Sequence, residues 1–225
     1  MINFEALFKV SYGLYIICSG DQNNGNGYIA NTFFQLTSEP AKFATSCNKD
    51  NYSSAFIEEN KHFSVSVLHQ QTAPELFGRF GYKSGRDGDK FSGLDIKYGI
   101  TNTPIVLNDS VAYFEFKLVD KIDVGTHWLF IGELVDAQII KSDFEPITYE
   151  YYRSIKKGIA PKNAPTYIDK SKLEKKVPSS DNKKFKCVVC NHIYDEGKEK
   201  VKFSDLDKHY ECPICGAEKE DFIEI

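Results

Sequence analysis

Alternating apolar and polar positions dominate the first 140 residues of the chain. Short runs rich in aromatic and β-branched residues recur between turn signals, a pattern typical of β-strands. An Asn/Gly-rich stretch at 19–26 separates the first two runs and predicts a tight turn. The predicted strands are Lys9–Cys18, Gly27–Thr32, Ala41–Cys47, His62–Leu68, Val111–Asp120 and Trp128–Ile140.

One segment departs from this alternation and predicts a helix. Polar residues open the stretch 50–60 and apolar residues follow, as they do at a capped helix N-terminus. Many strands with few helices indicate an antiparallel barrel at this length. We therefore expect a mainly β fold.

The composition changes along the 225 residues and predicts three parts. Residues 1–160 carry the strand pattern. Residues 161–184 are polar, rich in lysine and punctuated by proline, which predicts a linker or docking tail. Residues 185–225 hold four of the six cysteines and are predicted to form a small domain of their own.

Charge and hydropathy exclude two classes of partner. The net charge is −4, and no basic stripe or aromatic-interleaved arginine run supports nucleic-acid binding. The apolar run Leu14–Cys18 is far too short to span a bilayer. Residues 1–19 lack a basic leader and a small-residue cleavage site. We expect a cytoplasmic protein that binds neither membranes nor nucleic acid.

The most specific chemical signal is a pair of Cys-x-x-Cys motifs near the C-terminus. A two-residue gap lets one tight turn aim two thiolates at a single ion, and two such turns supply the four sulfurs of a tetrahedral iron or zinc site. In a reducing cytosol this spacing favours a metal over two disulfides. The predicted metal ligands are Cys187, Cys190, Cys212 and Cys215.

The sequence around these motifs resembles rubredoxin. Residues 185–196 resemble its first half, and residues 203–222, with Phe-x-Asp-Leu and Cys-Pro-x-Cys-Gly, resemble its second. The 21-residue insert between the motifs is shorter than is usual in that family. The resemblance implies a mononuclear Fe(Cys)4 site, and a structural zinc ribbon with the same ligands stays open as the alternative.

Two positions depart from the rubredoxin pattern, with Asn191 in place of Gly and Tyr210 in place of Trp. The backbone after each motif needs a positive φ so that its N–H groups can face sulfur. Gly216 adopts this conformation easily, and Asn is the next most tolerant residue. We expect a small aromatic core made of Tyr194, Phe203, Tyr210 and Phe222.

The first part of the chain, over residues 4–142, resembles the flavin-reductase-like FMN-binding domains. That family implies a split β-barrel and a homodimer with FMN near the subunit interface. The likeness depends on several segments found together: Asn26–Thr32, Gln35–Pro40, Cys47–Ser53, Phe63–Leu68, Phe80–Asp87, Asp89–Phe91 and Gly125–Glu133.

The resemblance and the chemistry of FMN together suggest a set of binding residues. A phosphate dianion needs backbone N–H groups, hydroxyls and a cation, and a helix N-terminus supplies the first. Without the family, the same residues read as a helix cap, a strand after a turn and a charged loop. No catalytic residue is assigned. The candidate FMN-binding residues are Ala30, Asn31, Thr32, Ser46, Cys47, Asn48, Lys49, Asn51, Ser53, Arg86, Lys90 and His127.

The two halves together predict an electron carrier. FMN accepts two electrons as a hydride and can release them singly, whereas a four-cysteine iron site carries one. The arrangement is similar to the flavin-reductase–rubredoxin fusions called high-molecular-weight rubredoxins. That resemblance implies transfer towards flavodiiron oxygen or nitric-oxide reductases.

The electron donor and the catalytic role stay open in the sequence. The chain has no Gly-x-Gly-x-x-Gly fingerprint, so NADH, NADPH and a separate reductase all remain candidate donors. One alternative is an NAD(P)H-dependent flavin reductase with a structural zinc ribbon. Another is a flavin-binding or storage protein without enzymatic activity.

Overall fold

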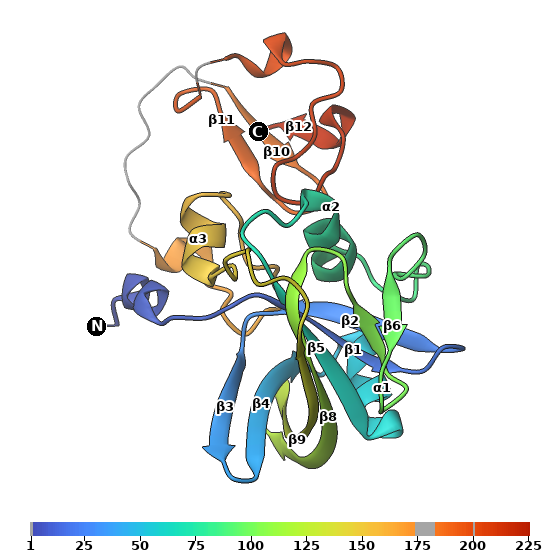
Figure 1. Cartoon of the computed structure of the whole chain (residues 1–225). Coiled ribbons are helices and arrows are strands. Elements are labelled where there is room, and N and C mark those ends of the chain that lie inside the picture. The colour runs from blue at the N-terminus through green and yellow to red at the C-terminus, as the bar shows by residue number, and fades with distance from the viewer. Residues whose placement is uncertain (1, 174–182, 200) are drawn as a thin grey trace.

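A curled antiparallel sheet of seven strands forms the larger body of the protein (Figure 1). The computed structural model describes residues 2–173, 183–199 and 201–225. The strand order is β2-β1-β5-β8-β9-β4-β3. The strands are β1 (Tyr15–Gly20), β2 (Gly25–Ala30), β3 (Phe33–Ser38), β4 (Ala41–Asn48), β5 (His62–Leu68), β8 (Ser110–Asp123) and β9 (His127–Ile139).

The sheet curls because its longest strand pair is irregular. The register between β8 and β9 shifts at Glu115/Phe116 and again at Leu118/Asp120, and such irregularities bend and twist strands. The concave side encloses a core of fully buried aromatic and aliphatic residues. Phe63 and Phe116 stack at its centre, with 4.9 Å between ring centroids. The expected mainly β fold is confirmed.

Short helices and one hairpin cover the ends of this barrel. Helix α1 packs against β1 and β2, and the hairpin of β6 and β7 contacts β1 and β5. The π-helical turn η2 continues directly from α2. The bounds are η1 (Phe4–Lys9), α1 (Tyr52–Asn60), α2 (Pro74–Phe77), η2 (Gly78–Tyr82), β6 (Ile96–Tyr98), β7 (Pro104–Val106), α3 (Tyr149–Ser154) and η3 (Lys170–Lys172).

The C-terminal part, which we call the metal module (residues 184–225), has its own three-stranded sheet in the order β11-β10-β12. The expected aromatic core is confirmed, because Tyr194, Tyr210 and Phe222 all pack around Phe203. Phe185 adds a stacked partner for Phe203, with centroids 4.1 Å apart. The elements are β10 (Lys184–Cys187), β11 (Ile193–Asp195), η4 (Phe203–Asp205), η5 (Lys219–Asp221) and β12 (Phe222–Glu224).

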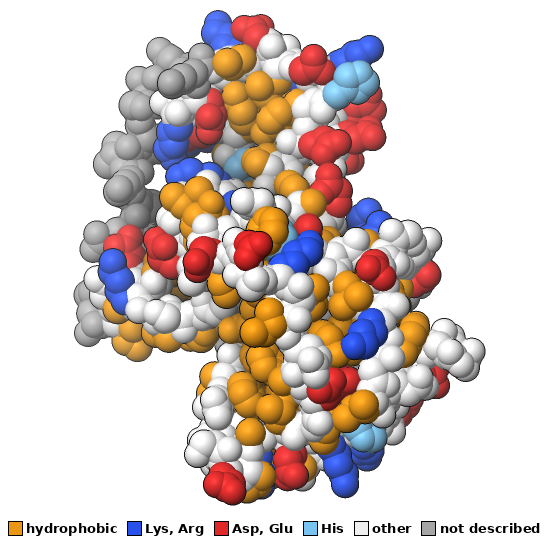
Figure 2. All heavy atoms as spheres, in the orientation of Figure 1, with side chains coloured by type: hydrophobic (Ala, Val, Ile, Leu, Met, Phe, Trp, Pro, Cys, Tyr) orange, Lys and Arg blue, Asp and Glu red, His pale blue; other side chains and the backbone are white. Residues whose placement is uncertain are grey.

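The metal module lies on the end of the barrel that carries α2 and α3 (Figures 1 and 2). One continuous cluster of buried residues crosses the boundary. It joins Leu76 and Phe77 of α2 and Tyr152 of α3 to Ile214 and Cys215 of the module. The two parts therefore share a hydrophobic core.

Most predicted elements agree with the structure. The helix begins after the N-cap Asn51, whose side chain accepts from the Ser53 N–H at 2.9 Å. Five of the six predicted strands are present with small shifts at their ends. The sixth, predicted from Lys9, begins only at Tyr15 because the preceding residues form the turn η1 and an extended connection.

Three strands of the larger body were missed. Five of the six residues of β3 are exposed, so the strand shows no buried alternate face. The hairpin strands β6 and β7 have three residues each, too few to display a period. Within the expected linker 161–184, residues 174–182 lie outside the described residues. The helices in the described ranges are too short or too polar to cross a bilayer.

Candidate functional site

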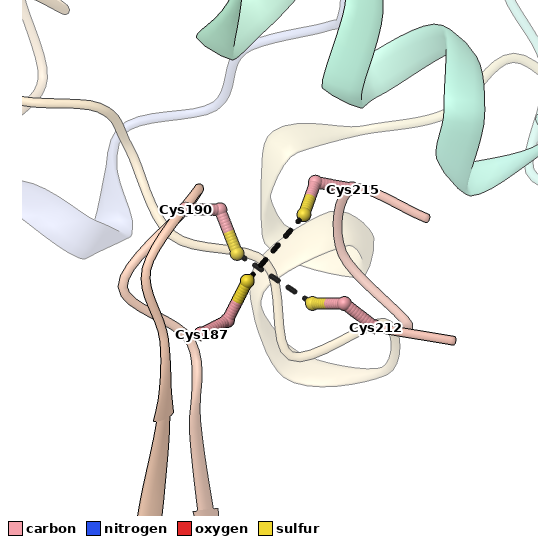
Figure 3. Close-up of side chains that lie close together, drawn as sticks. All are labelled: Cys187, Cys190, Cys212 and Cys215. Carbon is pink, nitrogen blue, oxygen red and sulfur yellow. Dashed lines mark hydrogen bonds between the residues drawn. The ribbon is translucent and has the colours of Figure 1, made fainter. Parts of the chain in front are cut away.

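Four cysteine sulfurs converge at the end of the metal module that faces the barrel (Figure 3). All lie within 4.8 Å of one another, and all four residues are buried. The Cys187–Cys215 and Cys190–Cys212 sulfurs are 3.8 and 3.6 Å apart. A tetrahedron with metal–sulfur bonds of about 2.3 Å has edges of about 3.8 Å. The donor set therefore fits one tetrahedral ion.

Both motifs are built by the same local backbone structure. The Asn191 N–H donates to the Cys187 carbonyl, and the Gly216 N–H donates to the Cys212 carbonyl, each at 2.9 Å. Asn191 and Gly216 have φ angles of 61° and 71°, as the sequence predicted. This turn directs N–H groups at sulfur. The His192 N–H donates to the Cys190 Sγ, with 3.4 Å between nitrogen and sulfur. Such donors stabilise negative charge on a thiolate site.

The sulfurs form two hydrogen-bonded pairs, Cys187 with Cys215 and Cys190 with Cys212. The neighbouring Cys190 and Cys215 groups lower the pKa of the Cys212 thiol, while the same sharing raises the pKa of Cys190. A cation bound at this centre favours the loss of the thiol protons.

A cavity of about 490 Å³ lies beside this centre. Its walls come from segments far apart in the sequence: Leu14 before β1, the end of β2, the β4–α1 junction, Phe77 and η2 with the loop after it, α3, and residues 159–165. Two residues of the first Cys-x-x-Cys turn, Val189 and Asn191, complete the wall on the module's side.

Seven of the candidate binding residues line this cavity. They include the strand end Ala30 and Asn31, and the cationic side chains Arg86 and Lys90 of the loop after η2. The guanidinium of Arg86 lies 4.7 Å from the ring centroid of Tyr52, which holds it at the cavity edge. The other three lie at the junction of β4 and α1 and are Ser46, Asn48 and Asn51.

The other five candidates do not line the cavity. Lys49 pairs with Asp123 at 2.6 Å and lies over the Trp128 ring. His127 contacts the Asn163 carbonyl at 3.1 Å. Burial raises the pKa of Cys47 to about 12, so this thiol stays protonated at neutral pH. Thr32 and Ser53 have buried hydroxyl oxygens without a hydrogen-bond partner in the described part of the chain.

Lys90 is the buried cation of the cavity wall. Its side chain is 7% exposed and its Nζ donates to the Gly27 carbonyl at 2.9 Å. Burial lowers the pKa of Lys90 to about 8, partly offset by the neighbouring Cys18 and Asp87. An ammonium group with one protein hydrogen bond retains donors for a ligand in the cavity.

Sequence reasoning missed a strap formed by residues 159–166. The Asn31 Nδ2 donates to the Thr166 Oγ1 at 2.6 Å, and His127 holds the strap through Asn163. Proline spacing and lysine content, which predicted a linker or docking tail from residue 161, describe solvation and do not reveal such tertiary contacts.

Two tyrosines of the cavity wall pack with the cysteines: Tyr152 is buried in the cluster that contains Cys190 and Cys215, and the half-buried Tyr82 packs against that cluster. Tyr82 and Tyr152 both line the cavity, and their hydroxyl oxygens are 3.5 Å apart. Tyr82 also donates to the Ile159 carbonyl at 2.6 Å. Burial raises the pKa of both phenols, and the nearby Cys190 and Cys215 raise them further. Nothing in the sequence showed which tyrosines face a cavity.

Comparison with known proteins agrees with this geometry. Residues 7–159 match the family model of the flavin reductase like domain, and residues 184–222 match that of rubredoxin. The chain belongs to the flavin reductase-like family and carries a C-terminal rubredoxin domain.

Relatives of this flavin reductase-like protein include one that aligns over nearly the whole chain. High molecular weight rubredoxin of Moorella thermoacetica is 39% identical, over 98% of this chain and 99% of that protein. Ferric-chelate reductase (NAD(P)H) of Archaeoglobus fulgidus is 44% identical, over 75% of this chain and 99% of its own length. A solved structure of flavin reductase HpaC complexed with NADP+ matches with a TM-score of 0.56 and 30% identity, covering 64% of this chain and 89% of that one.

Proposed function

We propose that this flavin reductase-like/rubredoxin fusion passes electrons between a reductant, FMN and a mononuclear Fe(Cys)4 site. The observation that carries the proposal is that Tyr82 and Tyr152 line the cavity and also pack in the hydrophobic cluster that contains Cys190 and Cys215. FMN would accept two electrons from a hydride and release them singly, which matches a one-electron iron site.

The polar residues of the cavity suit a flavin phosphate. Asn51 caps a nine-residue helix whose first N–H groups carry partial positive charge, and an anion is favoured there. Ser46 and Asn48 add polar side chains to the cavity wall at the same junction, and Arg86 supplies a cation at the cavity edge. The apolar strand end at Ile29 and Ala30 offers a surface for the flavin ring.

Iron is preferred over zinc because residues 184–222 match the rubredoxin family model, and because Ile-Tyr-Asp after the first motif and Phe-x-Asp-Leu before the second are rubredoxin-like features that a zinc ribbon does not require. A structural zinc ribbon with the same four ligands is the second candidate, and the rest of the protein would then act as an NAD(P)H-dependent flavin reductase. Elemental analysis with a visible spectrum separates them, since oxidised iron–thiolate absorbs in the visible and zinc does not.

Further parts of the proposal concern assembly and partners. Exposed apolar side chains on β3, β8 and β9, among them Phe34, Val119 and Ile139, support a homodimer. NADH or NADPH as direct donor is supported by the NAD(P)H-dependent reductase among the relatives. A flavodiiron-type acceptor follows from the likeness to high-molecular-weight rubredoxins. The proposed division is 1–160, 161–184 and 185–225, in cytoplasmic surroundings.

Anaerobic stopped-flow mixing tests the proposal. Holoprotein loaded with FMN and iron is mixed with NADH or NADPH while the flavin and iron bands are recorded separately. We expect bleaching of the flavin band followed by bleaching of the iron band. A Cys190→Ser variant, which lacks the iron, serves as control and should show only the first phase. Reduction of the flavin without reduction of the iron in wild-type protein would contradict transfer between the two sites.

A further inference from the structure

The metal module touches the barrel through two close backbone contacts. A methyl group built on Gly78 of η2 would overlap the carbonyl oxygen of Cys215. In the other direction, a methyl group built on Gly216 would lie 3.2 Å from Cγ and 3.4 Å from Cα of Glu75. Two glycines, one from each part, therefore allow the second cysteine turn to lie against α2 and η2.

Burial shows that this contact is a packed interface. Ile214 is 0% exposed and belongs to the same buried cluster as Leu76 and Phe77 of the barrel. Cys215 belongs to that cluster as well. A loosely attached module would leave such groups in contact with solvent.

The same docking places the first cysteine turn in the cavity wall. Val189 lies in the turn between Cys187 and Cys190, and Asn191 is the residue after Cys190. Both line the cavity together with Tyr82 and Tyr152, whereas the adjacent Val188 is 52% exposed and does not line it. The module thus contributes surface to a site otherwise made by the flavin reductase-like part.

We infer that the metal module is a structural part of the flavin site, with Val189 and Asn191 as flavin-contacting residues and Gly78 as the contact that registers them. This inference rests on the proposed function. Flavin binding and module docking are then coupled, and coupling between two binding equilibria is reciprocal. A docked module raises the affinity for flavin, and bound flavin favours the docked module.

A matched pair of variants in the first turn tests the contact. FMN affinity is measured by fluorescence titration of the full-length, iron-loaded chain. Val189→Ala removes half-buried apolar surface from the cavity wall, so the Kd for FMN should rise about threefold. Val188→Ala makes the same change on the solvent side and should leave the Kd unchanged. Equal Kd values for the two variants would overturn the assignment of Val189.

A second set of variants tests the registering contact. Gly78→Ala keeps a helical backbone but displaces Cys215, so the Kd for FMN should rise at least about threefold, as expected for loss of the Val189 wall. In the double variant Gly78→Ala/Val189→Ala, the second change should add nothing, because neighbours that act through one contact are not additive. The visible iron band and circular dichroism establish that each variant is folded and loaded.

Hydrogen exchange gives a readout independent of affinity. FMN should slow amide exchange in residues 188–191 of the wild-type protein and leave it unchanged in Gly78→Ala. An additive double variant, or an FMN effect on exchange that survives in Gly78→Ala, would overturn the inference while leaving the proposed function standing. Failure of the wild-type chain to bind FMN would instead overturn the proposed function and the inference together.

Discussion

The metal centre and the flavin cavity are assembled in opposite ways. The four sulfurs come from two short turns, each closed by one backbone hydrogen bond from the residue after its second cysteine. The cavity collects side chains from seven separate segments between Leu14 and Asn191. A centre built from local turns depends on its ion, whereas a cavity built from distant segments depends on the core that holds those segments in register.

The largest expected effect comes from removing a metal ligand. Cys215→Ser should abolish iron binding and unfold the metal module, because metal binding supplies about 10 kcal/mol or more to small thiolate domains. The barrel has its own core and should keep its melting transition and its ability to bind FMN, with weaker affinity. Metal analysis and hydrogen exchange of residues 183–199 measure the outcome. Complete loss of FMN binding would show that the cavity cannot form without the module.

Truncation of a core side chain tests how far the barrel, and not the metal module, depends on the barrel core. Phe116 is 0% exposed and packs against Phe63 and Phe130 at the centre of the barrel. Phe116→Ala should lower the free energy of unfolding of the barrel by about 3–5 kcal/mol. The module should retain its iron, since its ligands and aromatic core lie elsewhere. In denaturant titrations, the barrel transition followed by tryptophan fluorescence should move to lower denaturant while the transition of the iron band stays in place, and a parallel loss of iron would contradict the comparison.

The same contrast explains what the sequence could reveal. Cys187, Cys190, Cys212 and Cys215 were predicted as one site because the spacing of each pair fixes its geometry locally. Five of the predicted FMN-binding residues do not line the cavity. Likeness to a family identifies a segment of the chain but does not tell which of its side chains faces inward. Lys49 is an example, because it turns away to Asp123.

The module's contribution to the cavity could not be read from the sequence at all. Val189 and Asn191 stand within a rubredoxin-like motif whose spacing accounts for the metal and for nothing beyond it. Their second role arises from the packing of Cys215 against Gly78, a contact across 137 positions of sequence. No local pattern encodes contacts of this kind. The contacts of the strap, residues 159–166, with Asn31 and His127 could not be read from the sequence for the same reason.

Lys90 gives a smaller effect with a defined pH dependence. Its pKa is lowered to about 8 in the folded protein by burial, from an ordinary value of 10.5. Between these values the unfolded chain binds more protons, so stability rises as the pH increases from about 8 to about 10. The gain is at most about 3 kcal/mol.

The variant Lys90→Met isolates this contribution. It removes the titrating group and retains the apolar stem, so the pH dependence assigned to Lys90 should disappear. Urea titrations of both proteins without FMN, at pH 7 and pH 9.5, measure the difference. Stability curves that run parallel would show that Lys90 titrates normally and is not desolvated.

The smallest effect concerns the turn that both sites share. Asn191 has a φ of 61°, a conformation that costs an ordinary side chain about 1 kcal/mol more than it costs Gly or Asn. Asn191→Ala should therefore destabilise the loaded metal module by about 1 kcal/mol, and Asn191→Gly should be close to neutral. Iron release to a chelator, compared between the two variants, measures this strain.

Because Asn191 also lines the cavity, both variants should weaken FMN binding to a similar degree. Iron release would thus differ between the two variants because it reports backbone strain, whereas FMN affinity would fall in both because both lack the Asn side chain. These two measurements separate the two roles of Asn191.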